Sequence, residues 1–215
     1  MSAPASCGPC LSCGQALETP LVCTSCGNLF STEPAPGPFE TLGLPVSYTL
    51  DTKALKKRLL QFSRHVHPDF FGTADAQVQA TAERNSAQLN DAFEILSDDF
   101  RRADWIVKQL KGPSESDERQ MPQAFLMEVL EWNELLEEAR ADGPDSRAWK
   151  ALDTLDTDLC AERETTLAAV AAGLDPLPAE GAESLARTRR QLNAIRYLDR
   201  SLAQIRTMRL GAAAH

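Results

Sequence analysis

Apolar residues recur every three or four positions along most of this chain, which predicts a mainly helical protein. The first long stripe follows Leu50-Asp51-Thr52, where Asp51 or Thr52 is the expected N-cap. Its apolar members have the spacing of one helix face: Leu55, Leu59, Phe62 and Val66. Pro68 ends this helix, because proline disfavours helical geometry in the residue before it. The period resumes over residues 76–97, so the two helices are expected to pack as an antiparallel hairpin.

The pattern divides the chain into three blocks. Residues 1–37 are rich in Cys, Gly, Pro and Ser and lead into the run Glu33–Pro38, which we interpret as a proline-rich linker after a small metal knuckle. Residues 38–112 hold the helical hairpin and a shorter helix. Because the linker cannot be helical, the knuckle is expected to be separate, and the hairpin is expected to fold without residues 1–37.

The third block, residues 113–215, opens with an acidic linker. Helical periods then follow over 122–141, 145–173 and 180–209. Three long helices with short loops predict an antiparallel three-helix bundle.

The formal net charge of the 215 residues is -9, and it is unevenly distributed. Residues 112–164 carry fifteen acidic and five basic side chains, whereas five basic residues cluster between Lys53 and Arg64. An acidic chain without a large basic face argues against nucleic acid as the main partner. No apolar run approaches the roughly 18 residues that cross a membrane, so no membrane association is expected.

The first ten residues show neither the basic and apolar segments of a signal peptide nor the arginine-rich pattern of a mitochondrial transit peptide. We therefore expect a cytoplasmic protein if the source is bacterial, with its thiols reduced. The mitochondrial matrix is the expectation if the source is eukaryotic, although no transit peptide is seen.

Two copies of one cysteine pattern lie in the first block: Cys10-Leu11-Ser12-Cys13-Gly14 and Cys23-Thr24-Ser25-Cys26-Gly27. Each places two thiolates on a tight turn, and its glycine leaves backbone amides free to face sulfur. Four thiolates at this spacing, those of Cys10, Cys13, Cys23 and Cys26, predict one tetrahedral structural zinc site. Two disulfides and an iron ion in the same tetrathiolate are the alternatives; reducing conditions disfavour the disulfides.

Two further cysteines are not expected to bind this metal. Cys7 is spaced from Cys10 and Cys13 as at the start of a ferredoxin cluster motif, but Leu17 stands where the fourth cysteine would follow. We therefore expect no iron–sulfur cluster to be bound stably by this chain. Cys160 lies among the leucines of a predicted helix, which indicates a buried structural thiol.

The triplet His67-Pro68-Asp69 joins the basic helix to the loop after it. Lys53, Lys57 and Arg64 lie on one predicted face of that helix, where they can steer an acidic partner. The alternatives are a solvated face for the charges and a packed, capping or catalytic role for the histidine. No nucleophile motif lies nearby to support catalysis.

The triplet, the basic helix before it and the long helix after it together resemble a J domain. The segments Pro38–Leu44 and Asn90–Ser97 resemble that domain's short first helix and the end of its third. The residues Phe70-Phe71 after the triplet are typical of the HscB type, the co-chaperones of iron–sulfur cluster assembly. Phe125–Glu134 and Leu192–Asp199 are similar to that family's C-terminal helices, and some members carry two CxxC pairs.

The resemblance implies a co-chaperone that is not itself an enzyme. His67, Pro68 and Asp69, with Lys53, Lys57 and Arg64, would contact a DnaK-class (HscA-like) chaperone and stimulate its ATPase. The bundle would bind an IscU-like cluster scaffold protein and deliver it for cluster transfer and protein maturation. The scaffold contacts, carried over by motif, are Leu126, Met127, Leu130, Glu131, Glu134, Arg196 and Tyr197. From spacing alone, the leucines could instead fill the bundle core.

Two other functions are considered beside this one. A general J-domain chaperone would hold unfolded clients, but such proteins carry a Gly/Phe-rich linker and client-binding β domains, and this chain has neither. An oxidoreductase would use the cysteines, but the sequence has no cofactor loop and no third CxxC.

Overall fold

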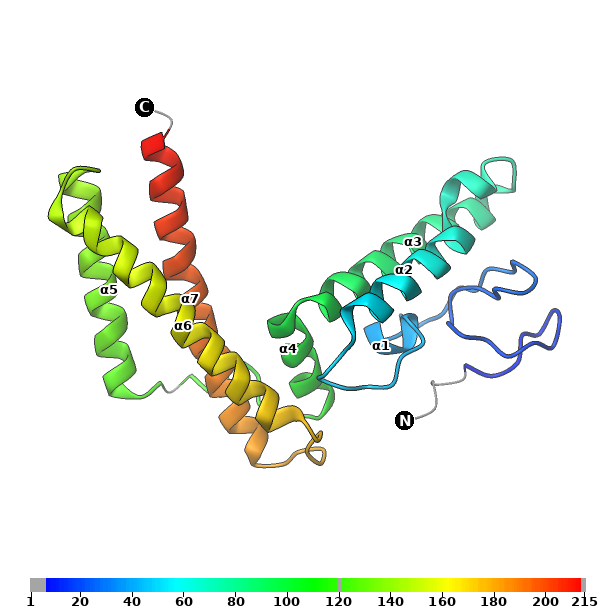
Figure 1. Cartoon of the computed structure of the whole chain (residues 1–215). Helices are drawn as coiled ribbons and strands as arrows, with labels where there is room; N and C mark the ends of the chain where they lie inside the picture. The colour runs from blue at the N-terminus through cyan, green and yellow to red at the C-terminus, as the bar shows by residue number, and fades with distance from the viewer. Residues whose placement is uncertain (1–6, 120, 214–215) are drawn as a thin grey trace. The chain divides into compact units, whose positions relative to one another are not determined.

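A computed structural model describes the chain over residues 7–119 and 121–213. The described part is mainly helical, as the sequence predicts, with no strand beyond two isolated β-bridges. It contains no helix that is long and apolar enough to span a membrane. The elements are α1 (Pro38–Thr41), α2 (Thr52–Val66), the 3-10 helix η1 (Pro68–Phe71), α3 (Ala76–Ser97), α4 (Asp99–Gln109), α5 (Gln123–Asp142), α6 (Arg147–Leu174) and α7 (Ser184–Ala213) (Figure 1).

The chain forms two compact units, Met1–Arg102 and Ala103–His215. In the first unit, α2 and α3 form the expected hairpin (Figure 1). The Asp51 carboxylate caps α2 by accepting hydrogen bonds from the backbone N–H groups of Lys53 and Ala54, at 2.8 and 3.2 Å. Asp75 caps α3 in the same way. The apolar stripes predicted from the sequence are largely buried, including Leu55, Phe62, Val66, Ala82, Leu89 and Leu96.

The first unit also contains the cysteine knuckle, which is packed on the helices. Leu21 is fully buried, and the Thr19 hydroxyl donates to the Thr41 carbonyl oxygen of α1 at 2.8 Å. The side-chain amide of Asn85 in α3 donates to the carbonyl oxygens of Leu21 and Phe30, at 2.8 and 3.0 Å. The structure thus differs from the expected separate knuckle. Proline stops a helix, but it does not prevent the segment before it from packing against the helices after it.

The second unit is the predicted bundle of α5, α6 and α7. Ser146 caps α6, because its hydroxyl oxygen accepts a hydrogen bond from the backbone N–H of Trp149 at 3.0 Å. Leucines from all three helices fill the core, whose buried members include Leu136, Leu152, Leu155, Leu159, Leu198, Leu202 and Ile205. Burial of these side chains is the main source of stability for the unit.

Most of α4 belongs to the second unit, so the division falls between Arg102 and Ala103, within α4, and not at residue 112. A buried ion pair ties α4 to α7. The guanidinium of Arg189 is fully buried, and its Nη1 donates to Asp104 Oδ1 at 2.5 Å. Burial opposes ionisation of Asp104, but hydrogen bonds from Lys108 and Arg189 outweigh it and lower the pKa of that carboxyl.

Replacing Asp104 should therefore lower the free energy of unfolding. In Asp104→Asn, the buried Arg189 charge loses its counter-charge, and such losses cost roughly 3–5 kcal/mol. We expect urea unfolding of the full chain at neutral pH to show a decrease of that order in the free energy of unfolding. Asp158→Asn, an exposed position in α6, is the matched control and should change stability little.

The pH dependence of the same pair has a defined sign. A carboxyl whose pKa is lower in the folded state stabilises the fold above its unfolded-state pKa, and this contribution is lost as the pH falls through its folded-state pKa. The difference in stability between wild type and Asp104→Asn should therefore narrow as the solution is acidified through that range. A difference that stays constant down to the lowest pH would contradict this assignment.

Candidate metal centre and partner-binding surfaces

The two cysteine turns share one backbone geometry. Gly14 and Gly27 both have a φ of +75°, a left-handed conformation that glycine adopts without strain. Each glycine N–H donates to the carbonyl oxygen of the first cysteine of its turn, Cys10 or Cys23, and both distances are 2.8 Å. The repeated CxxCG pattern thus specifies two equivalent turns.

Backbone amides face the sulfur atoms in these turns, as the pattern predicts. The N–H of Cys26, assisted by that of Ser25, overcomes the effect of burial and lowers the pKa of the Cys23 thiol to about 6. The first turn has the equivalent pair of amide donors to Cys10. Such donors favour the thiolate, the form that binds a metal ion, at the first cysteine of each turn. At Cys13, the hydrogen bond from the Gln15 N–H is outweighed by burial and the neighbouring thiols, which raise the pKa to about 12.

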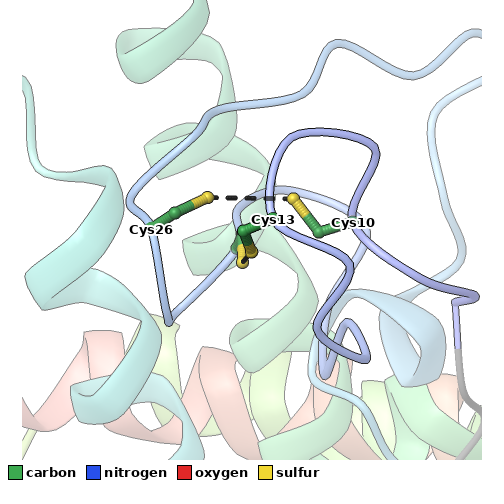
Figure 2. A group of neighbouring side chains, drawn as sticks. Cys10, Cys13 and Cys26 are labelled. Carbon is green, nitrogen blue, oxygen red and sulfur yellow. Dashed lines mark hydrogen bonds between the residues drawn. The ribbon is translucent and has the colours of Figure 1, made fainter.

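The four sulfur atoms converge at one place. Figure 2 shows the side chains of Cys10 and Cys26 pointing toward each other from two loops, with Cys13 beside them. All four lie within 4.8 Å of one another; the Cys10 and Cys26 sulfurs are 3.7 Å apart, and those of Cys13 and Cys23 are 3.6 Å apart. A zinc ion with sulfur ligands at about 2.3 Å requires sulfur–sulfur distances of about 3.8 Å, the edge of a tetrahedron. The four side chains therefore fit a tetrahedral metal ion, and not disulfides, whose sulfurs are about 2.05 Å apart.

The other two cysteines lie outside this group. Cys7 is half-buried, and its burial, followed by the negative charge of Glu40, raises the pKa of its thiol. Cys160 is half-buried against the bundle core, which is the packing role expected for it. Neither sulfur belongs to the group of four, and that neither residue binds the metal stays a prediction.

The His-Pro-Asp turn is exposed at the end of α2. His67 is the C-cap of α2, and Pro68 begins η1, so the triplet marks the change of chain direction. The Asp69 N–H donates to His67 Nδ1 at 3.3 Å, and 51% of the His67 side chain and 87% of the Asp69 side chain are exposed. The Phe70 ring lies edge-on to the imidazole and is itself exposed. The turn therefore presents polar and aromatic groups to a partner.

Beside this turn, the basic face of α2 carries a hollow of about 600 Å³. Lys53, Lys57 and Arg64 line it, as the helical spacing predicts, together with Lys56, Leu60, Gln61 and His65. Arg58 does not line it; its Nη1 instead forms an ion pair with Glu18 of the knuckle, at 2.6 Å from Oε2. The cationic side chains without an acid among the lining residues suit an acidic partner.

The predicted scaffold surface begins on α5. Leu126, Met127 and Leu130 are 45%, 58% and 59% exposed, so these side chains do not fill the bundle core. Glu131 and Glu134 of the same helix are exposed as well. Three adjacent exposed aliphatic side chains bordered by acids have the character of a small protein-binding patch.

Arg196 and Tyr197 lie on α7 and are half-buried. The Tyr197 ring contacts Phe125 of α5 edge to face, with centroids 5.8 Å apart, so it adjoins the start of the aliphatic patch. Both residues line a cavity of about 800 Å³ beside Asp104, and Arg196 forms an ion pair with Glu115. The structure thus brings Tyr197 next to α5, whereas Arg196 already has an acidic partner.

Sequence reasoning missed several residues that hold these surfaces in place. Glu18 and Asn85 fix the knuckle on α2 and α3, and Asp104 with Arg189 ties α4 to the bundle. One available signal was Asn85, a polar residue in the apolar stripe of α3.

An exposed His-Pro-Asp turn between two antiparallel helices, followed by a helical bundle, is the architecture of the J-domain co-chaperone class. Residues 121–206 match the HSCB C-terminal oligomerisation domain. The chain is 40% identical over 103 residues to the co-chaperone protein HscB homolog of Mannheimia succiniciproducens, and 37% identical over 118 residues to that of Pasteurella multocida. These matches cover 47% and 53% of this chain and 60% and 69% of the relatives. The chain belongs to the HscB family of co-chaperones.

Solved structures agree with this assignment and confirm the predicted fold. The crystal structure of human co-chaperone protein HscB superposes with a TM-score of 0.75 at 25% identity, covering 94% of this chain and 99% of that one. Chaperone HscB from Vibrio cholerae gives a TM-score of 0.66 at 25% identity, covering 80% and 96%.

Metal analysis of cysteine variants tests the ligand set. Cys7→Ser should retain one zinc ion per chain, because its sulfur lies outside the group of four. Cys13→Ser should lose most of the zinc, because a structural site needs all four of its ligands. Loss of the metal from Cys7→Ser, measured by plasma mass spectrometry of the purified protein, would show that the ligand set is wrong.

Proposed function

We propose that this protein is an adaptor between a DnaK-class (HscA-like) chaperone and an IscU-like iron–sulfur cluster scaffold protein. It stimulates the ATPase of the first and delivers the second to it, which promotes cluster transfer and protein maturation. The observation that carries this proposal is the presence of two exposed surfaces on two compact units: the His-Pro-Asp turn on one and the aliphatic patch on the other.

The chaperone docks on the first unit. The cationic side chains of Lys53, Lys57 and Arg64 steer an acidic chaperone surface and set its register. His67 and Asp69 then make polar contacts at the end of α2, on a turn whose direction Pro68 fixes. These residues bind and position the chaperone, and the hydrolysis is the chaperone's own.

The scaffold protein docks on the second unit. Leu126, Met127 and Leu130 supply an apolar centre, with Glu131 and Glu134 at its rim. Arg196 and Tyr197 extend the surface from α7, and Tyr197 supports α5 through Phe125. An apolar centre with a charged rim suits a specific partner that must later be released.

The metal has a structural role in this scheme. Zinc held by Cys10, Cys13, Cys23 and Cys26 would cross-link the two turns of the knuckle, and four thiolates fill its tetrahedral coordination. We therefore propose no enzymatic activity for the chain and no stably bound cluster of its own; the cluster is cargo carried by the scaffold. The site of action is the cytoplasm of a bacterium, or the mitochondrial matrix in a eukaryote.

A general J-domain chaperone for unfolded clients is the second candidate. The exposed aliphatic side chains of α5 could contact unfolded clients. However, a patch of three residues is small for binding unfolded chains of varied sequence, so it gives this function only partial support. The HscB relatives favour the adaptor.

Substitution of the turn histidine tests the chaperone half of the proposal. His67→Gln should abolish stimulation of the chaperone ATPase and leave scaffold affinity unchanged, because sites on separate compact units that share no partner contribute nearly additively. Steady-state ATP hydrolysis by a DnaK-class chaperone from the same genome, with and without the scaffold, is the measurement. Stimulation that survives the substitution would remove the chaperone-docking role of this turn.

Truncation of the aliphatic patch tests the scaffold half. Leu126→Ala combined with Leu130→Ala should weaken scaffold binding at least about 30-fold, since the loss of even one interface anchor costs roughly 2 kcal/mol. The melting temperature should hardly change, because exposed truncations usually cost within about 0.5 kcal/mol. Leu210→Ala, an exposed leucine near the end of α7, is the matched control. Equal scaffold affinities of the double variant and the control in titration calorimetry would refute the patch.

A further inference from the structure

A polar side chain occupies the buried face of α3. Ala82, Asn85, Leu89 and Leu96 are at most 1% exposed and follow one helical stripe. The Asn85 amide has its donors satisfied by two carbonyl oxygens of the knuckle, those of Leu21 at 2.8 Å and Phe30 at 3.0 Å. A buried amide without such acceptors is costly. The helical hairpin therefore depends on the knuckle at this position.

Two further contacts join the knuckle to the helical elements of the first unit. The Glu18 carboxylate accepts hydrogen bonds from Arg58 Nη1 at 2.6 Å and from Gln61 Nε2 at 3.3 Å, both in α2. Gly43, with a φ of +62°, approaches the knuckle backbone so closely that an added Cβ would lie 2.1 Å from the Glu18 carbonyl oxygen. The knuckle thus contacts α2, α3 and the turn after α1.

The knuckle residues that contact the helices lie close to the four cysteines in the sequence. Glu18, Thr19 and Leu21 fall between Cys13 and Cys23, and Phe30 lies shortly after the second cysteine turn. A metal ion bound to both turns closes the segment between them into a loop. The loop has less conformational entropy to lose when the Leu21 carbonyl oxygen takes a fixed position. The ion and the helical hairpin therefore order the same stretch of backbone.

We propose that metal binding at the cysteine knuckle is thermodynamically coupled to the helical hairpin, with Asn85 and Glu18 as the positioning residues. Coupling is reciprocal: if the bound metal stabilises the packing of α2 and α3 on the knuckle, that packing raises the affinity for the metal by the same factor. Gln61 also lines the basic hollow, so the coupling extends to the chaperone-docking face; that extension alone rests on the proposed function.

The direct test is the zinc affinity of a variant whose substitution lies far from the cysteines in the sequence. Asn85→Ala in the full chain should weaken zinc binding about tenfold, because the two carbonyl acceptors lose their donor. Asn90→Ala, an exposed asparagine in the same helix, should bind zinc like the wild type. Competition with a chromophoric zinc chelator measures the zinc affinity of the wild type and both variants, without any chaperone or scaffold. An Asn85→Ala affinity within twofold of the wild type would overturn the proposal.

A second measurement covers the case in which Asn85→Ala does not fold. Zinc is removed from the wild-type chain, and amide hydrogen exchange is followed in both units. Exchange in α2 and α3 should become at least about tenfold faster, while α6 and α7 in the other unit serve as the internal control and should not change. Unchanged protection of α2 and α3 after metal removal would overturn the coupling. The adaptor function would stand in that case, since neither experiment involves its partners.

Discussion

The hydrogen bonds from Asn85 to the carbonyl oxygens of Leu21 and Phe30 hold the knuckle on α3 in the first unit. They fix a segment with almost no regular structure against a long helix, in a place where water cannot replace them. The knuckle then brings Glu18 to α2, where it pairs with Arg58 and leaves the lysines of that helix on the open face. The cysteine knuckle thus contacts the same helix that ends at the His-Pro-Asp turn.

The helices and the convergence of four cysteines could be predicted because their causes are local. Asp51 and Ser146 cap helices through groups two or three residues away, and each CxxCG turn is specified within five residues. The contact between Asn85 and Leu21 spans 64 positions, and that between Arg58 and Glu18 spans 40, so no local pattern reveals either partner. For the same reason, the proline-rich run correctly indicated a break in helix but not how the segment before it packs.

The proposed scaffold contacts show a related limit of prediction from the sequence. The spacing of Leu126 and Leu130 places them on one helix face, but periodicity does not distinguish a face that meets the core from one that meets a partner. The exposure of the side chains distinguishes the two cases. Both leucines are about half exposed, so their face does not meet the core. The contact between α4 and α7 has the same long range: the partner of Asp104 is Arg189, 85 positions later, so no local pattern reveals it.

The two units differ in their surface chemistry. The open face of α2 is cationic, whereas the patch on α5 is aliphatic with acidic neighbours, so the two surfaces favour different partners. The proposed adaptor function requires this difference, because a partner that bound both surfaces would compete with the other partner for the chain.

Sedimentation velocity of this chain with a DnaK-class chaperone and an iron–sulfur scaffold protein tests the central claim most directly. The adaptor account predicts one complex that contains all three proteins, formed only when this chain is present. Two separate binary complexes, in which the scaffold displaces the chaperone, would contradict it.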